Sequence, residues 1–260
     1  MSDQKPSPIG ETARAWNVTR TQWIWVVVVL ATVGLVFYFY ELLNTAPPAS
    51  RWPAYYASIP GSESLLQPLT GKTPYQTFVL KSWLDEKIPF MPLLAIPYLS
   101  LLVIVPIVVP LLNLAAGSYR RFLTIGVALI VSQLFLNVAY ILFQTLVVRD
   151  VQAGPGIGGW LVGQVWGHDL PFNCYPSGHC TWTTIGIIAL WRLRRRFPKT
   201  AWVLMAWLCL VYPATVSLRQ HYLMDVYAGI FVGFACYWAC MFLVERPRLV
   251  PHDEPPFISA

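Results

Sequence analysis

Long apolar segments dominate this sequence and limit what the chain can fold into. Hydrophobic residues make up 56% of its 260 residues, whereas charged residues make up only 12%. A soluble domain typically contains about 25% charged residues, and a helix that crosses a bilayer needs about 20 consecutive, mainly apolar residues. The composition therefore predicts an integral membrane protein and excludes a soluble domain, a disordered chain and a collagen-like chain.

Six apolar segments are candidates for membrane spans. They are residues 23–43, 91–115, 123–148, 180–191, 201–218 and 221–244. The fourth segment is short, so we expect it to recruit flanking residues or to lie partly outside the bilayer. Four prolines in the second segment predict kinks, which neighbouring helices of a bundle can accommodate. The sequence therefore predicts an all-α membrane protein, a bundle of six transmembrane helices.

The distribution of basic residues predicts how this bundle is oriented. If the N-terminus lies inside the cell, twelve of the 18 Lys and Arg residues fall on inner segments and the remaining six on outer segments. This bias follows the positive-inside rule for membrane proteins. We therefore expect two cytoplasmic termini, residues 1–22 and 245–260, around a membrane domain of residues 23–244. The loops 44–90, 149–179 and 219–221 then face the extracytoplasmic side.

Charge and loop composition also bear on location and partners. The net charge of +6 is explained by the cytoplasmic basic residues, so we expect membrane lipids and no nucleic acid as partners. The Asn-x-Thr sequence at Asn17 lies on the predicted inner side, which fits a bacterial inner membrane. The outer loop 44–90 is rich in aromatic residues and predicts short helices on the membrane face, either as a lid or as simple anchors.

Three polar clusters fall on the predicted outer side, at the ends of spans. Ionisable residues at the membrane are costly and therefore suggest function. If the topology is right, the three clusters lie at a similar depth. They are Arg149 after the third span, Pro176-Ser177-Gly178-His179 before the fourth, and Arg219-Gln220-His221 leading to Asp225 in the sixth.

His221 and Asp225 are four residues apart, which places them on one face of a helix. A carboxylate in that position can accept the imidazole N–H, fix the tautomer and make the other ring nitrogen a better nucleophile. The alternative is a structural His–Asp pair that holds the end of a helix. The spacing alone is compatible with both interpretations.

The run Ser177-Gly178-His179 lies where a loop becomes a helix. Backbone N–H groups at a helix N-terminus bind anions, and glycine allows the backbone to approach a ligand closely. His179 can donate a proton to a leaving oxygen. The alternative is an ordinary helix start with Ser177 as its N-cap.

Arg149 and Arg219 complete a set of groups suited to a phosphoester. Each guanidinium can donate two hydrogen bonds to phosphate oxygens, although either one alone could instead snorkel to the membrane interface. Arginine and helix N–H groups stabilise charge without a metal, and the Cys and His residues show no zinc-type spacing. Cys174 and Cys180 flank the same loop, either as a disulfide or as two free thiols.

The motif Pro176-Ser177-Gly178-His179, followed by His221 and, four residues later, Asp225, resembles the type 2 phosphatidic acid phosphatase superfamily. The resemblance covers residues 120–244 and implies a six-helix membrane bundle, a phosphohistidine intermediate and no cofactor. By this resemblance His221 attacks phosphorus, Asp225 orients His221, and His179 protonates the leaving group. The phosphoryl oxygens are then held by Arg149, Ser177, Gly178 and Arg219.

Several positions depart from the usual motifs of that family. Leu142 stands where the first motif has Lys, and Asp150 stands where it has Pro. Thr215 stands where the third motif has Arg, and Arg219 lies only two residues before His221. Together with the run 169–173, Asp-Leu-Pro-Phe-Asn, these departures resemble the phosphotransferase branch that includes the sphingomyelin and inositol phosphorylceramide synthases.

The resemblance predicts a metal-independent membrane enzyme with its active site on the outer face and a lipid phosphate or phospholipid as substrate. The favoured function is hydrolysis of a lipid phosphomonoester or pyrophosphate through His221. The alternative is transfer of a phosphorylated head group to a lipid alcohol by the same histidine, since the acceptor depends on the surrounding cavity. A non-catalytic lipid transporter with this fold is a third interpretation, and it would tolerate the loss of His221.

Overall fold

The computed structural model describes residues 18–45, 79–143 and 145–246, and most of these residues are helical. Within these ranges the extended segments form one isolated antiparallel bridge, between Leu146 and Phe172. The prediction of an all-α protein is therefore confirmed. The surface helices predicted for the 44–90 loop fall largely outside the described residues.

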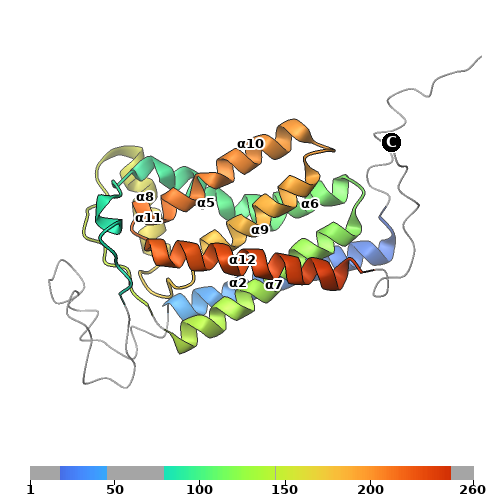
Figure 1. Ribbon diagram of the computed structural model, residues 1–260, viewed down its shortest axis with the longest axis horizontal. Helices are drawn as coiled ribbons and strands as arrows, with labels where there is room; N and C mark the ends of the chain where they lie inside the picture. The colour runs from blue at the N-terminus through green and yellow to red at the C-terminus, as the bar shows by residue number, and fades with distance from the viewer. Residues whose placement is uncertain (1–17, 46–78, 144, 247–260) are drawn as a thin grey trace, which may run out of the picture.

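Long apolar helices run side by side, and shorter elements gather at one end of the molecule (Figure 1). The second predicted span is a series of four elements, η3 (Pro92–Leu94), α5 (Ala95–Val103), η4 (Ile104–Val108) and α6 (Val109–Ala115). The elements at the end that contains the polar clusters include η2 (Asp85–Lys87), α8 (Gly156–His168) and α11 (Val211–Ser217). The longer helices are α2 (Arg20–Thr45), α7 (Tyr119–Leu142), α9 (Gly178–Leu193), α10 (Pro198–Cys209) and α12 (Leu223–Val244).

Five helical stretches are long and apolar enough to cross a membrane, so the chain is an integral membrane protein. Each of the five overlaps a predicted span, and the remaining one, the fourth predicted span (180–191), falls within α9. This helix has only 16 residues, yet it packs against α7, α10 and α12 within the bundle (Figure 1). The five stretches are Arg20–Asn44, Pro92–Ala115, Tyr119–Leu142, Pro198–Ser217 and Leu223–Val244.

Two span boundaries, the end of α7 and the start of α12, differ from the prediction in ways that affect the polar clusters. Helix α7 ends at Leu142 rather than at residue 148, because the apolar residues that follow pair with the 171–172 segment instead of continuing the helix. Helix α12 begins at Leu223, with Tyr222 as its N-cap. The expectation that His221 lies on a helix face with Asp225 is therefore wrong, since His221 lies in the connection before α12.

Proline shapes the second span, as the sequence predicts. Pro106 lies in η4, a π-helical turn between α5 and α6. Proline has no backbone N–H and interferes with regular α-helical hydrogen bonding, and single π-helical turns within longer helices accommodate such irregularities. Pro106 and Ile107 of this turn line an apolar groove against α2.

Two glycines allow α12 to approach α9 closely. A Cβ built at Gly229 would clash with the backbone oxygen of Ser177, and one built at Gly233 would clash with that of Thr181. Small residues four positions apart are a common means of close packing between membrane helices. Because Ser177 immediately precedes α9, the contact at Gly229 also fixes the start of α9 against the first half of α12.

Candidate active site

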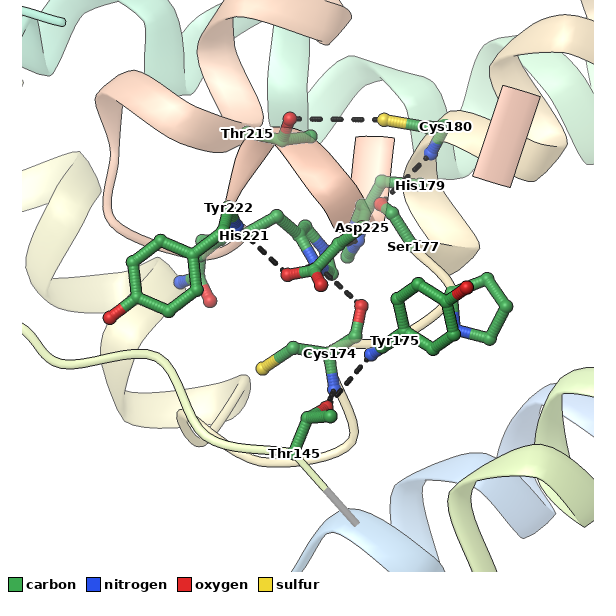
Figure 2. A network of polar contacts seen from close by, with 12 residues as sticks. Thr145, Cys174, Tyr175, Ser177, His179, Cys180, Thr215, His221, Tyr222 and Asp225 are labelled. Carbon is green, nitrogen blue, oxygen red and sulfur yellow. Dashed lines mark hydrogen bonds and ion pairs between the residues drawn. The ribbon is translucent and has the colours of Figure 1, made fainter. Parts of the chain in front are cut away.

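The two histidines predicted from the sequence lie next to each other, one at the start of α9 and one just before α12 (Figure 2). The Nε2 atom of His221 is 3.4 Å from the Nδ1 atom of His179, and the ring centroids are 5.7 Å apart. Ser177 and Asp225 flank the pair (Figure 2). The fold therefore unites two of the three polar clusters around one pair of imidazoles.

A backbone carbonyl sets the tautomer of His221. The Cys174 carbonyl oxygen lies 2.9 Å from His221 Nδ1, and a carbonyl oxygen can only accept a hydrogen bond. Nδ1 therefore carries the hydrogen, which leaves the lone pair of the neutral ring on Nε2. Since Nε2 is also the nitrogen that faces His179, the ring presents a nucleophilic atom to the site.

Asp225 caps α12 and also faces His221. Its Oδ2 atom accepts a hydrogen bond of 2.8 Å from the backbone N–H of Tyr222, and the same oxygen lies 3.6 Å from His221 Nδ1. The residue is 1% exposed, so its carboxylate is held close to the imidazole and away from solvent. The geometry contains features of both roles considered from the sequence, an orienting carboxylate and a structural group at a helix end.

Ser177 and Gly178 form the start of α9 beside the histidines. The Oγ atom of Ser177 accepts a hydrogen bond of 3.2 Å from the backbone N–H of Cys180, which makes Ser177 the N-cap of the helix. At Gly178, a Cβ would lie only 3.3 Å from the hydroxyl oxygen of Tyr140. The N-terminal partial positive charge of α9 is thus located next to His179.

Arg149 connects three separate parts of the chain near the two histidines. Its Nη groups donate hydrogen bonds to the backbone oxygens of Trp166 (3.1 Å) and Asp169 and to the side-chain oxygen of Gln220 (3.1 Å). Burial lowers the pKa of the Arg149 guanidinium, and the negative charge of Asp169 opposes this effect. Its Nε has no hydrogen-bond partner within the described parts of the chain. Phosphate binding by the Nη groups would therefore require an exchange of these contacts.

Arg219 lines a polar cavity on one side of His221. Its backbone φ is 56°, in the left-handed region that non-glycine residues rarely adopt. Its Nε donates a hydrogen bond of 3.1 Å to Asp150 Oδ1. Asp150 and Arg219, two of the positions that depart from the usual motifs, therefore form an ion pair with each other. The charged and polar residues of this cavity are Lys81, Asp85, Glu86, Asp150, Arg219, His221 and Tyr222.

A second, mainly apolar cavity borders both histidines. Three of its lining residues, Phe37, Leu102 and Trp182, also line an apolar groove between α2 and η4. Apolar surface thus continues from this groove to the two imidazoles. The cavity is lined by Phe37, Tyr40, Leu101, Leu102, Gln133, Tyr140, Asn173, Gly178, His179, Trp182 and His221.

Tyr98, beside His179, is a site residue that the sequence analysis misses. It stacks on His179 with 4.2 Å between ring centroids, but it lies in an apolar span where nothing in the local sequence distinguishes it. For Asp169 the sequence leaves open a contact with a head group or an ordinary turn of an outer loop, and in the structure its carboxylate accepts a hydrogen bond from Tyr98. The Cys174 carbonyl has no side-chain signature at all, so only the fold reveals its role.

The described residues include free thiols and no cluster of metal ligands. Cys174 and Cys180 are both free and buried, so the alternative of two free thiols is the one that the structure contains. No group of three or more His, Cys, Asp and Glu side chains that could hold a metal ion occurs in the described ranges.

Comparison with known proteins gives one match. A sequence model described as the PAP2 superfamily matches residues 75–248, a range that includes both histidines, Asp225 and both arginines. No curated protein and no solved structure matched the chain. The match concerns the superfamily as a whole and gives no evidence for the phosphotransferase branch.

Proposed function

Because this chain belongs to the PAP2 superfamily, we propose that it is a membrane phosphatase that removes phosphate from a lipid phosphomonoester or pyrophosphate. The observation that carries the proposal is the pair of facing imidazoles, with His221 Nε2 3.4 Å from His179 Nδ1. One ring presents a lone pair and the other can present a proton. These are the two groups that phosphoryl transfer to a histidine requires.

The reaction has two steps. In the first, the lone pair of His221 Nε2 attacks phosphorus, the bond from phosphorus to the leaving oxygen breaks, and that oxygen takes a proton from His179. In the second, water attacks the phosphohistidine and gives a proton to His179 as the nitrogen–phosphorus bond breaks. Asp225 stabilises the positive charge that develops on the His221 ring. The products are the dephosphorylated lipid and inorganic phosphate.

The phosphoryl oxygens are bound by groups around the two rings. Backbone N–H groups at the start of α9, next to Ser177 and Gly178, adjoin His179, and Arg219 lines a cavity that includes His221. Arg149 joins this set when it exchanges a protein oxygen for a phosphate oxygen. Guanidinium and helix N–H groups supply the charge stabilisation without a metal or cofactor.

The apolar cavity supports a lipid as the substrate. A hydrocarbon chain placed against Phe37, Leu102 and Trp182 would lie in the groove between α2 and η4, and the small cavity at the histidines, about 20 Å³, would widen to admit its phosphorylated end. We further propose that α9 is the sixth crossing. The positive-inside rule then places the termini in the cytoplasm and the histidines on the extracytoplasmic face, in our proposal that of a bacterial inner membrane.

Head-group transfer is a second candidate, and the polar cavity favours it. Lys81, Asp150 and Arg219 line a space that also reaches His221, and this space offers charged partners for the polar part of a phosphorylated head group. In this reaction the head group is transferred to His221 first, and a lipid alcohol replaces water in the second step.

Product analysis tests the proposal. Purified protein is incubated with phosphatidic acid, an isoprenyl pyrophosphate, phosphatidylinositol and ceramide, and all products are followed by mass spectrometry. We expect inorganic phosphate from phosphatidic acid or the pyrophosphate. The rate should fall at least about a thousandfold in His221→Ala and about 10²–10⁴-fold in His179→Ala.

The matched control is His168→Ala, because His168 is an exposed histidine at the end of α8. This variant should retain the wild-type rate. Undiminished phosphate release by folded His221→Ala would overturn the proposal. Formation of a phosphorylated acceptor lipid without free phosphate would instead establish head-group transfer.

A further inference from the structure

The Asp169 carboxylate accepts hydrogen bonds from three side chains on two helices. Its Oδ1 accepts from the Tyr40 hydroxyl at 2.7 Å and from the Asn44 amide at 2.9 Å, both on α2. Its Oδ2 accepts from the Tyr98 hydroxyl of α5 at 2.9 Å. A carboxylate with three such donors is well satisfied as the charged form. Asp169 therefore provides a fixed negative charge between α2 and α5.

Tyr98 connects this charge to His179. Because the Tyr98 hydroxyl hydrogen points to Asp169, its oxygen lone pairs remain available as acceptors. The oxygen is 3.3 Å from His179 Nδ1, so in this arrangement Nδ1 carries a hydrogen and donates it. The two rings are also stacked, with 24° between their planes. The chain of donors runs from His179 Nδ1 through Tyr98 to Asp169.

Tyr98 holds the His179 ring at the nitrogen that lies beside the nucleophile. His179 Nδ1 is 3.3 Å from the Tyr98 oxygen and 3.4 Å from His221 Nε2. The nitrogen that lies beside the nucleophile is therefore the one in contact with Tyr98, and the ring so held carries the proton for the leaving oxygen on its other nitrogen, Nε2. Packing alone would be served equally well by phenylalanine, since Tyr98 is 3% exposed in an apolar span.

We propose that Tyr98 and Asp169 are positioning residues for His179. Tyr98 accepts the Nδ1 hydrogen of His179, and the Asp169 charge, acting through the Tyr98 hydroxyl, stabilises the doubly protonated ring, whose other hydrogen, on Nε2, goes to the leaving oxygen. When the leaving oxygen takes the Nε2 proton, the neutral His179 ring keeps its Nδ1 hydrogen bonded to Tyr98, and Tyr98 and Asp169 keep their own proton and charge. The proposal rests on the proposed phosphatase function and adds to it the groups that make His179 an effective acid.

A pair of substrates with one lipid chain separates this role from a merely structural one. An isoprenyl monophosphate must expel a basic alkoxide, which depends on protonation by His179. The pyrophosphate with the same chain expels a phosphate monoester, which is a much weaker base and needs less help. A positioning role therefore affects the two substrates unequally, whereas a general disturbance of the site affects both alike.

The experiment compares Tyr98→Phe with wild type on both substrates by measuring kcat/KM for phosphate release. We expect Tyr98→Phe to lose at least about tenfold on the monophosphate and less than about twofold on the pyrophosphate. Asp169→Asn keeps an oxygen that can accept from Tyr98 but removes the charge, so it should show the same unequal loss. Thermal unfolding checks that both variants fold.

The matched control is Tyr237→Phe, which removes a buried hydroxyl that accepts a hydrogen bond of 3.1 Å from Arg192, in the half of the molecule away from the histidines. It should retain wild-type rates on both substrates. Equal losses on the two substrates in folded Tyr98→Phe, or no loss on either, would overturn the positioning role. Wild-type protein that releases phosphate from neither of these substrates nor from phosphatidic acid would instead overturn the proposed function on which it rests.

Discussion

At His221, one backbone hydrogen bond decides which ring nitrogen can react. The Cys174 carbonyl takes the Nδ1 hydrogen at 2.9 Å, and Asp225 stands farther off, 3.6 Å from the same nitrogen. The sequence identifies both His221 and Asp225, because their residue types and spacing are distinctive. It does not identify the carbonyl, because any residue has one and only the path of the 169–177 loop brings it to the ring.

Asp225→Asn separates the two roles that Asp225 combines. Asparagine keeps a side-chain oxygen for the Tyr222 N–H, so the cap of α12 is retained, but the negative charge near His221 is lost. We expect a melting temperature close to that of wild type and a kcat lower by at least about tenfold. Asp225→Ala should lose about 1 kcal/mol of stability in addition. Full activity of Asp225→Asn in phosphate release would show that Asp225 is only a helix cap.

Between elements, the contact of α9 with α12 positions the candidate site. Gly229 and Gly233 let α12 lie against the backbone of Ser177 and Thr181, so both histidines are attached to the same tight crossing. Hydrophobic length predicted these helices well. It failed at their ends, since residues 145–148 are apolar but pair with 171–172 rather than extending α7. Helix ends depend on such tertiary pairing and on caps like Tyr222, which composition does not reveal.

Gly229→Ala tests the importance of this crossing. The new methyl group would meet the Ser177 carbonyl, so the helices must separate, and we expect a loss of about 1–3 kcal/mol in stability together with reduced activity. Gly163→Ala in α8 is the control, because no heavy atom lies within 4 Å of a Cβ built there. Thermal unfolding should show the control to be unchanged or slightly stabilised. Equal melting temperatures for the two variants would contradict the account.

On the scale of the whole molecule, the site lies between two different environments. A polar cavity with Lys81 and Arg219 lies on one side of His221, and an apolar cavity that continues toward α2 and η4 borders both histidines. This arrangement fits a lipid phosphate whose chain stays in the apolar region while its phosphate reaches the nucleophile. The sequence predicts that the polar clusters lie on one membrane side, but the two cavities arise from packing between distant helices.

The orientation of the bundle depends on whether α9 crosses the membrane. If it does, the residues before and after α9 lie on opposite sides. We expect a membrane-impermeant thiol reagent to label His168→Cys in intact cells and to label Lys199→Cys only after permeabilisation, in a background where the exposed Cys209 is replaced by Ser. Labelling of both positions from the same side would show that α9 does not span the membrane and that the termini lie on opposite sides.

The central claim, that His221 is the nucleophile, is tested most directly by trapping the phosphorylated enzyme. Phosphohistidine is labile in acid, so the reaction with a lipid phosphate is quenched in alkali, and the peptides are mapped by mass spectrometry. The account predicts a phosphoryl group on His221 that disappears once the substrate is consumed. Rapid turnover with no phosphoryl group on His221, or with the group on another residue, would contradict it.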